Sequence, residues 1–273
     1  MRKIGIIFQA MPGLTDEEYV QEMVKHGFQT TFSGVYGWEK HKELTELFDR
    51  YGIECETLHA PFNHINDMWL DCEGGNQLMD ELKESVECCV IAKAPIMVLH
   101  LSSSNTPPSI SDIGRKRYAE IVEYAAARNV KIAFENQRKT SHLAWAMETF
   151  EDHPMVGFCW DCGHEACCQN GRQFMPFYGK QLICTHIHDN CGKPDMDDHL
   201  LPFDGAVNFE RFAEHIRNSG YQGSFMLEVH NSVHRYDDWS AKKFLEEAAM
   251  RVKKLVQMTD GMSQMAIHIE KKH

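Results

Sequence analysis

Two histidines in the segment LICTHIHDN, residues 182–190, have a spacing that could serve metal chemistry. They are His186 and His188, and side chains two residues apart point to the same face of an extended strand. A half-buried polar strand end would explain such a pair. A metal site would also explain it, but that site needs further ligands from elsewhere in the chain. Further metal-binding residues elsewhere in the sequence would therefore favour a metal site over a polar strand end.

Residue types that bind metals stand at or near the ends of six consecutive predicted strands. They are His59, His100, Glu135, Asp161, His186 with His188, and Glu228. A lone histidine or glutamate at such a position is more often a hydrogen-bonded structural residue. Carboxylates gathered at one low-dielectric rim, however, would repel one another unless a cation neutralised them. The repetition therefore favours a metal site over six separate structural roles.

The strands that would position these residues are short apolar runs that alternate with longer helical segments. We expect strands at 3–8, 30–35, 55–60, 96–101, 131–136, 156–161, 183–188 and 224–229. We also expect a helix between Thr15 and Gly27, because threonine is a good N-cap, acidic residues fill the first turn and glycine favours the C-terminus. Later segments carry apolar residues at three- and four-residue spacing, which predicts the remaining helices.

Eight strand-and-helix units with no break in composition predict an α/β fold, a single (β/α)8 TIM barrel. We expect the barrel over 1–258 and a peripheral C-terminal tail over 259–273. The active site of this fold lies at the C-terminal ends of the strands, where the residues above stand. A doubly wound open sheet is the alternative fold, but the first predicted turn, FQAMPG, lacks the glycine pattern GxGxxG.

The composition limits the classes of partner. The formal net charge is −12 at pH 7, which disfavours nucleic acid and anionic membrane surfaces. The N-terminal apolar run is too short for a signal peptide, and no segment is long enough to predict a membrane span. Ten cysteines without a signal peptide predict a reducing compartment, so we expect a cytoplasmic protein. The adjacent pairs Cys88–Cys89 and Cys167–Cys168 suit no regular disulfide framework, and we interpret most cysteines as small buried apolar residues.

Six motifs, taken as an ordered set, resemble a known family. They are LHAPF, VLHLS, FEN, WDCGH, HIHDN and LEVH, and the resemblance runs from about Ile4 to Val256. The set is similar to the xylose isomerase-like TIM-barrel superfamily, which includes the sugar phosphate isomerase and epimerase group and AP endonuclease family 2. The resemblance implies a small sugar or sugar-derived substrate, and it allows a homo-oligomer.

The resemblance implies a shared divalent-metal site on four residues, Glu135, Asp161, His186 and Glu228. His186 matches the family's ligand because it stands three residues before the aspartate of its motif. A site of carboxylate oxygens and one imidazole suits Mn, Mg, Co or Zn, and the sequence does not choose among them. The residues expected to bind substrate are His59, His100, His164 and His188.

The first functional hypothesis is a metal-dependent isomerase or epimerase of a sugar, sugar phosphate or polyol. Polarising a substrate carbonyl acidifies the neighbouring C–H and stabilises an enediolate. By the resemblance, Glu135 and Glu228 are the catalytic pair that removes and returns the proton. The chain departs from the family's ketose epimerases at Asn136, Gln137 and Arg138, where those enzymes usually carry a second glutamate. The identity of the substrate therefore stays open.

Two alternatives use the same strand ends. An endonuclease IV-like multi-zinc phosphodiesterase would need additional metal ligands, and the matching residues are His59, His100, His164, Asp197 and His199. The net charge of −12 counts against it, because DNA binding needs a positive footprint. An inosose dehydratase-type lyase would use the same enolate step as an isomerase.

Two aromatic residues after the third predicted strand have two interpretations each. Phe62 and Trp69 could wall the substrate pocket and stack on a sugar ring, or they could pack in the core. The sequence does not separate the two roles.

Overall fold

The computed structural model describes residues 2–169 and 171–270. Eight strands form one parallel sheet in the order β7-β6-β5-β4-β3-β2-β1-β8, with helices between consecutive strands. Beyond the end of β7, Ile187 forms a parallel bridge to Leu227 of β8, so the two outer strands of this order also meet. The fold is therefore a nearly closed (β/α)8 barrel, which confirms the predicted fold class and excludes the open doubly wound sheet.

The predicted strands are all present, and no strand end differs from its predicted position by more than two residues. The observed strands are β1 Ile4–Ile7, β2 Thr30–Gly34, β3 Glu54–His59, β4 Ile96–Leu99, β5 Lys131–Glu135, β6 Val156–Asp161, β7 Leu182–His186 and β8 Phe225–Leu227. They are short and mostly buried, as expected of parallel strands covered by helices on one face and filling a barrel on the other.

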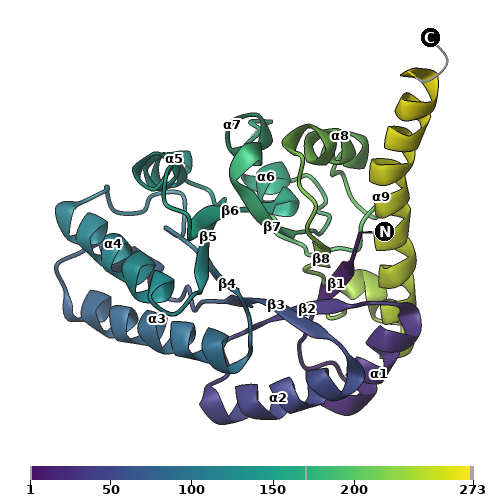
Figure 1. Cartoon of the computed structure of the whole chain (residues 1–273), viewed down its shortest axis with the longest axis horizontal. Helices are drawn as coiled ribbons and strands as arrows, with labels where there is room; N and C mark the ends of the chain where they lie inside the picture. Colours follow the sequence, from purple (N-terminus) through teal and green to yellow (C-terminus); the bar gives the residue numbers. More distant parts are fainter. Residues whose placement is uncertain (1, 170, 271–273) are drawn as a thin grey trace. The chain divides into compact units, whose positions relative to one another are not determined.

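The chain divides into two compact units. The central unit is Thr30–Cys159, and the terminal unit joins Met1–Gln29 to Trp160–His273. In the central unit, the register pairs His59 with Val98 and Glu135 with Cys159. Figure 1 shows α2, α3 and α4 outside the strands of this unit. Its helices are α2 Trp38–Tyr51, η1 Ile65–Trp69, α3 Glu73–Ile91, α4 Asp112–Ala126 and α5 Thr140–Thr149.

The terminal unit holds both outer ends of the sheet order. Ile4 of β1 pairs with Phe225 of β8, and the long helix α9, Ala241–Glu270, packs against both strands. Figure 1 shows α9 in yellow beside β1 and β8. The remaining helices of this unit are α1 Asp16–His26, α6 Cys162–Cys168, α7 Met175–Tyr178, η2 Gly179–Gln181, α8 Phe209–Ser219 and η3 His234–Tyr236.

Helix α1 begins and ends where its sequence signals predict. The Thr15 side chain accepts a hydrogen bond from the Glu18 amide, and the Glu18 carboxylate accepts one from the Thr15 amide. Gly27 ends the helix at φ +84°, a left-handed conformation that glycine adopts without strain. Local chemistry alone therefore predicts both ends of α1.

The predicted C-terminal tail begins inside α9. This helix continues without a break past residue 258 to Glu270, while residues 271–273 lie outside the described part of the chain. The predicted domain boundary at 258 stays a prediction. Among the described residues, no helix combines the length and the apolar character that crossing a membrane requires.

Candidate metal centre

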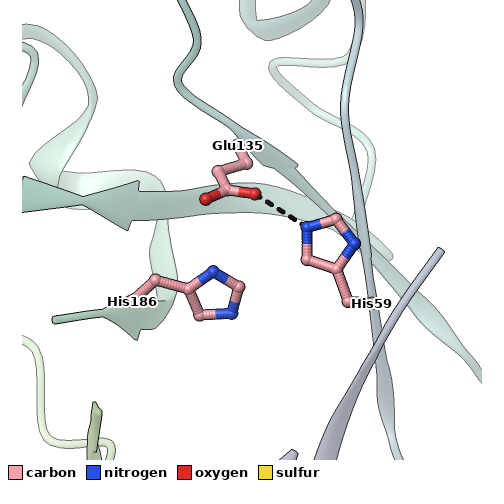
Figure 2. Close-up of side chains that lie close together, drawn as sticks. All are labelled: His59, Glu135 and His186. Carbon is pink, nitrogen blue, oxygen red and sulfur yellow. Dashed lines mark hydrogen bonds and ion pairs between the residues drawn. The ribbon is translucent and has the colours of Figure 1, made fainter. Parts of the chain in front are cut away.

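In the central unit, three of the predicted site residues form one cluster. Glu135 ends β5 and is 1% exposed, and its Oε2 lies 2.8 Å from His100 Nε2 and 3.2 Å from His59 Nε2. His59 ends β3 and His100 directly follows β4. Figure 2 shows the His59 ring aimed at the Glu135 carboxylate. The structure therefore brings together a buried carboxylate and two imidazoles, all from neighbouring strand ends.

The orientation of the His59 ring decides which of its nitrogens faces the Glu135 carboxylate. Its Nδ1 is 2.7 Å from the carbonyl oxygen of Ala60, which can only accept, so Nδ1 carries the proton of that hydrogen bond. In the neutral ring, the Nε2 lone pair then faces the Glu135 carboxylate. Lone pair and carboxylate repel each other unless the ring is protonated or a cation neutralises both. The donor set therefore fits a cation.

Two further side chains border the central cluster. The amide nitrogen of Gln137 lies 3.0 Å from His100 Nε2, so this residue reaches the cluster. Phe62 stacks on the His100 ring with centroids 4.7 Å apart, and 48% of Phe62 is exposed. Trp69 is different: it is 2% exposed, and its indole N–H donates to the Leu101 carbonyl at 2.6 Å. The structure thus places Trp69 in the core and leaves Phe62 as the exposed aromatic residue beside His100.

In the terminal unit, Asp161 connects two histidines. It ends β6 and is fully buried, and its Oδ1 accepts a 2.6 Å hydrogen bond from the His164 amide as the N-cap of α6. His188 Nε2 lies 3.1 Å from the same carboxylate. His188 is itself fully buried, and its Nδ1 has no hydrogen-bond partner among the described residues. One carboxylate and two imidazoles therefore lie together in an environment almost closed to water.

The remaining predicted ligands of the terminal unit lie at the ends of β7 and β8. His186 ends β7, and its Nδ1 is 3.1 Å from Glu228 Oε2, one residue past the end of β8. Ligand atoms of two triads in this unit lie within 4.8 Å of one another: Asp161, His164 and His188; and His188, His199 and Glu228. Imidazole nitrogen and carboxylate oxygen together suit Zn, Mn or Co.

Asp197 and His199 form an ion pair in the loop after β7. Asp197 Oδ2 lies 3.0 Å from His164 Nε2 and 3.4 Å from His199 Nε2. Burial by itself would raise the pKa of Asp197, but the hydrogen bonds from both histidines lower that pKa well below its ordinary value. Burial by itself would lower the pKa of His199, but Asp197 and Glu228 raise it to about 9. This pair is therefore charged at neutral pH.

The end of the HIHDN motif anchors the loop that carries this ion pair. The buried Asp189 carboxylate accepts hydrogen bonds from the amides of Gly205 and Val207, at 2.8 and 2.9 Å. The Asn190 side chain accepts from the Asp198 amide at 2.6 Å and donates to the Gly163 carbonyl at 2.8 Å. Asp189 and Asn190 therefore hold the backbone on either side of Asp197 and His199 in place.

His230 lies beside the predicted ligand His199 but is not itself among the predicted site residues. Its ring stacks on His199 with centroids 4.3 Å apart, and His199 stacks in turn on His188 at 4.1 Å. Burial and the neighbouring His199 charge lower the pKa of His230 to about 4, so its ring is neutral at pH 7. His230 stands two residues after Glu228, a spacing that places both side chains on one face of an extended segment. That spacing is the signal that could have found it.

Comparison with known proteins identifies the family. The model of the xylose isomerase-like TIM barrel family matches residues 19–254, and the chain belongs to this family. An uncharacterized protein of Methanocaldococcus jannaschii is 27% identical over 205 residues, which are 70% of this chain and 69% of that protein.

Two solved structures share the fold. A D-tagatose 3-epimerase-like protein superposes with a TM-score of 0.75 at 22% identity, covering 96% of this chain and 99% of that one. The IOLI protein, solved with a zinc atom, has a TM-score of 0.73 at 18% identity and covers the chains to 96% and 99%. At these identities, the likeness is one of fold.

Proposed function

We propose that this protein is a divalent-metal-dependent isomerase or epimerase that acts on a sugar, a sugar phosphate or a polyol. The observation that carries the proposal is the pair of strand-end glutamates, each held by imidazoles. Glu135 lies beside His59 and His100, and Glu228 lies beside His186. Two carboxylates can divide the work of removing a proton from a carbon atom and returning one.

In this proposal the ion is held by Glu135, Asp161, His186 and Glu228. These residues stand at the C-terminal ends of β5 to β8, the rim where barrels of this fold carry their active sites. A divalent ion bound there would polarise the substrate's carbonyl and hydroxyl oxygens and so acidify the neighbouring C–H. The solved IOLI protein contains zinc, which supports a metal in this family without fixing its identity here.

The protein's own side chains would carry the proton. One of Glu135 and Glu228 removes the proton from the carbon next to the carbonyl, and the other returns one from the opposite face. Return to the same carbon inverts its configuration, and return to the neighbouring carbon moves the carbonyl. His59, His100, His164 and His188 are proposed to hold the substrate's hydroxyl groups through their ring nitrogens. The likeness to a D-tagatose 3-epimerase-like protein supports a ketose as the first substrate to test.

A second candidate function rests on the Asp197 cluster. The ring nitrogens of His164 and His199 lie 3.0 and 3.4 Å from Asp197 Oδ2, so the carboxylate of Asp197 contacts both of these further candidate zinc ligands. An endonuclease IV-like phosphodiesterase would use such a site together with His59 and His100. The net charge of −12 opposes the binding of a DNA backbone, so this candidate stays second. An inosose dehydratase-type lyase would share the first proton abstraction with the isomerase.

Solvent deuterium exchange tests the proposal. Mn-loaded protein is incubated in deuterated water with D-tagatose, then with other ketoses, inososes and their phosphates, and each product is examined by NMR. We expect deuterium at one carbon next to a carbonyl in at least one substrate, and none after the metal is chelated. Equal exchange by chelated protein, with metal loss verified, would contradict the metal-dependent mechanism. Cleavage of an abasic-site oligonucleotide without any sugar exchange would favour the phosphodiesterase.

A further inference from the structure

Helix α6 ends in two adjacent cysteines whose sulfur atoms lie unusually close together. The Sγ atoms of Cys167 and Cys168 are 3.1 Å apart, within reach of an S–H···S hydrogen bond. Adjacent side chains on a helix normally diverge around the axis, and these two converge at the last residue of α6, where the helix gives way to Gln169. The pair therefore presents two thiols to one point in space.

A disulfide is a poor product for this pair. Consecutive Cα atoms are about 3.8 Å apart, whereas disulfides usually join Cα atoms separated by roughly 4.4–6.8 Å. A single atom bonded to both sulfurs keeps them further apart than the ~2 Å of an S–S bond, which suits the spacing seen here. The geometry thus favours a bridging ligand over oxidation of the pair.

The surroundings give one sulfur access to solvent and bury the other. Cys168 is partly exposed, while Cys167 is buried, with its Sγ 3.9 Å from the His164 carbonyl oxygen. The other adjacent pair in the described chain, Cys88 and Cys89 in α3, is fully buried. A ligand can therefore approach Cys168 first and close onto Cys167, and the α3 pair offers no such entry.

We propose that Cys167 and Cys168 form a vicinal dithiol site for a soft, trivalent metalloid, with an organic arsenoxide as its chemical type. In its hydrated form, the arsenoxide carries two hydroxyl groups on arsenic. Two As–S bonds form and two As–O bonds break, and each thiol proton leaves with a hydroxyl group as water. Arsenic stays trivalent throughout, so the step needs no oxidant or reductant. Soft sulfur atoms prefer such a metalloid over the hard cations that the carboxylates of the proposed metal centre would take.

Hydrogen bonds connect the end of α6 to the loop that carries Asp197. The Cys167 carbonyl accepts a hydrogen bond from the Asp195 amide at 3.1 Å, two residues before Asp197. His164, one turn earlier on α6, contacts Asp197 directly. Binding of one arsenic atom by both sulfurs would constrain the last turn of α6. It would therefore disturb the contacts of Cys167 with Asp195 and of His164 with Asp197, whichever reaction the barrel catalyses.

Phenylarsine oxide is the probe, used with the full-length reduced protein and intact-mass spectrometry. We expect one adduct per chain that survives excess 2-mercaptoethanol and is removed by dithiothreitol, because only a second dithiol matches the chelate. Cys168→Ser should weaken binding about a hundredfold by removing the second bond, while the exposed control Cys191→Ser should leave it unchanged. Peptide mapping of the wild-type adduct, which depends on no variant, should place arsenic on the peptide that holds both cysteines. An adduct mapped elsewhere, or one removed by the monothiol, would overturn the proposal.

Discussion

His59 Nε2 lies 3.2 Å from Glu135 Oε2, while the other nitrogen of the same ring is committed to the Ala60 carbonyl. This relationship fixes which imidazole nitrogen faces the buried carboxylate (Figure 2). A neutral ring in this tautomer presents a lone pair to a negative charge, which is stable when a cation lies close by. The cluster of His59, His100 and Glu135 therefore suits a bound cation.

Glu135→Gln is expected to remove catalysis while the barrel stays folded. The amide keeps the size of the carboxylate but cannot take a proton, so proton exchange at the substrate carbon should fall by on the order of a hundredfold or more. Deuterium incorporation into a ketose substrate measures the loss. Glu120→Gln, an exposed change on α4 of the same unit, is the matched control and should keep the wild-type rate. Wild-type exchange in Glu135→Gln would remove this residue from the mechanism.

Phe62→Ala is expected to weaken substrate binding more than it slows the chemistry. The Phe62 ring is exposed beside His100, where it can stack on the apolar face of a sugar. Removing it should raise KM by about tenfold and change kcat less, since the proton-transferring groups remain. Steady-state kinetics of Phe62→Ala and Phe62→Tyr measure both KM and kcat and so test this prediction. A Phe62→Tyr variant as impaired as the alanine variant would argue against stacking.

Trp69→Ala is expected to act on stability. Trp69 is buried against Tyr118 and Trp145 and donates its indole hydrogen to the Leu101 carbonyl. Truncating it leaves a cavity and removes one of the two hydrogen bonds that the Leu101 carbonyl accepts, the other coming from the Tyr118 hydroxyl. The free energy of unfolding should fall by about 3–5 kcal/mol. Urea denaturation measures the change. If Trp69→Ala instead raised KM at unchanged stability, the residue would belong to the pocket after all.

Glu165→Gln is expected to stabilise the protein at neutral pH. Burial raises the pKa of Glu165, although hydrogen bonds from the Phe174 amide and the Trp160 indole oppose the shift. Since the folded-state pKa lies above the unfolded-state value, Glu165 stabilises the fold below the unfolded-state pKa. That contribution is lost as the pH rises through the folded-state pKa. The neutral amide still accepts both hydrogen bonds, so the variant avoids the loss.

Denaturation of the wild type and of Glu165→Gln at pH 4 and pH 7 tests the predicted direction of the stability change. The variant should gain on the order of 1 kcal/mol over wild type between the two pH values, because the buried charge forms only in the wild type. A gap that stays constant with pH would show that Glu165 does not titrate in this range.

Much of the barrel and most of the clustered residues could be predicted from the sequence because each signal is local. Strand ends carry His59, Glu135 and Asp161, and the period-two spacing of His186 and His188 needs no tertiary information. The contacts of Asp189 with Gly205 and Val207 could not be predicted, since they join segments through a loop without periodicity. The different environments of Phe62 and Trp69 depend on the packing of Trp69 against Tyr118 and Trp145, which composition does not encode.

Metal content per chain is the measurement that tests the central claim most directly. Purified protein and the variant His186→Ala are stripped, reloaded with Mn, Co, Mg or Zn, dialysed and analysed for elements. His215→Ala is the control, because this half-buried histidine on α8 bonds to Gln173 and belongs to no predicted ligand set. We predict about one ion per chain in the wild type and control, and far less in His186→Ala. No bound ion in the reloaded wild type, or equal content in His186→Ala, would contradict the proposed metal centre.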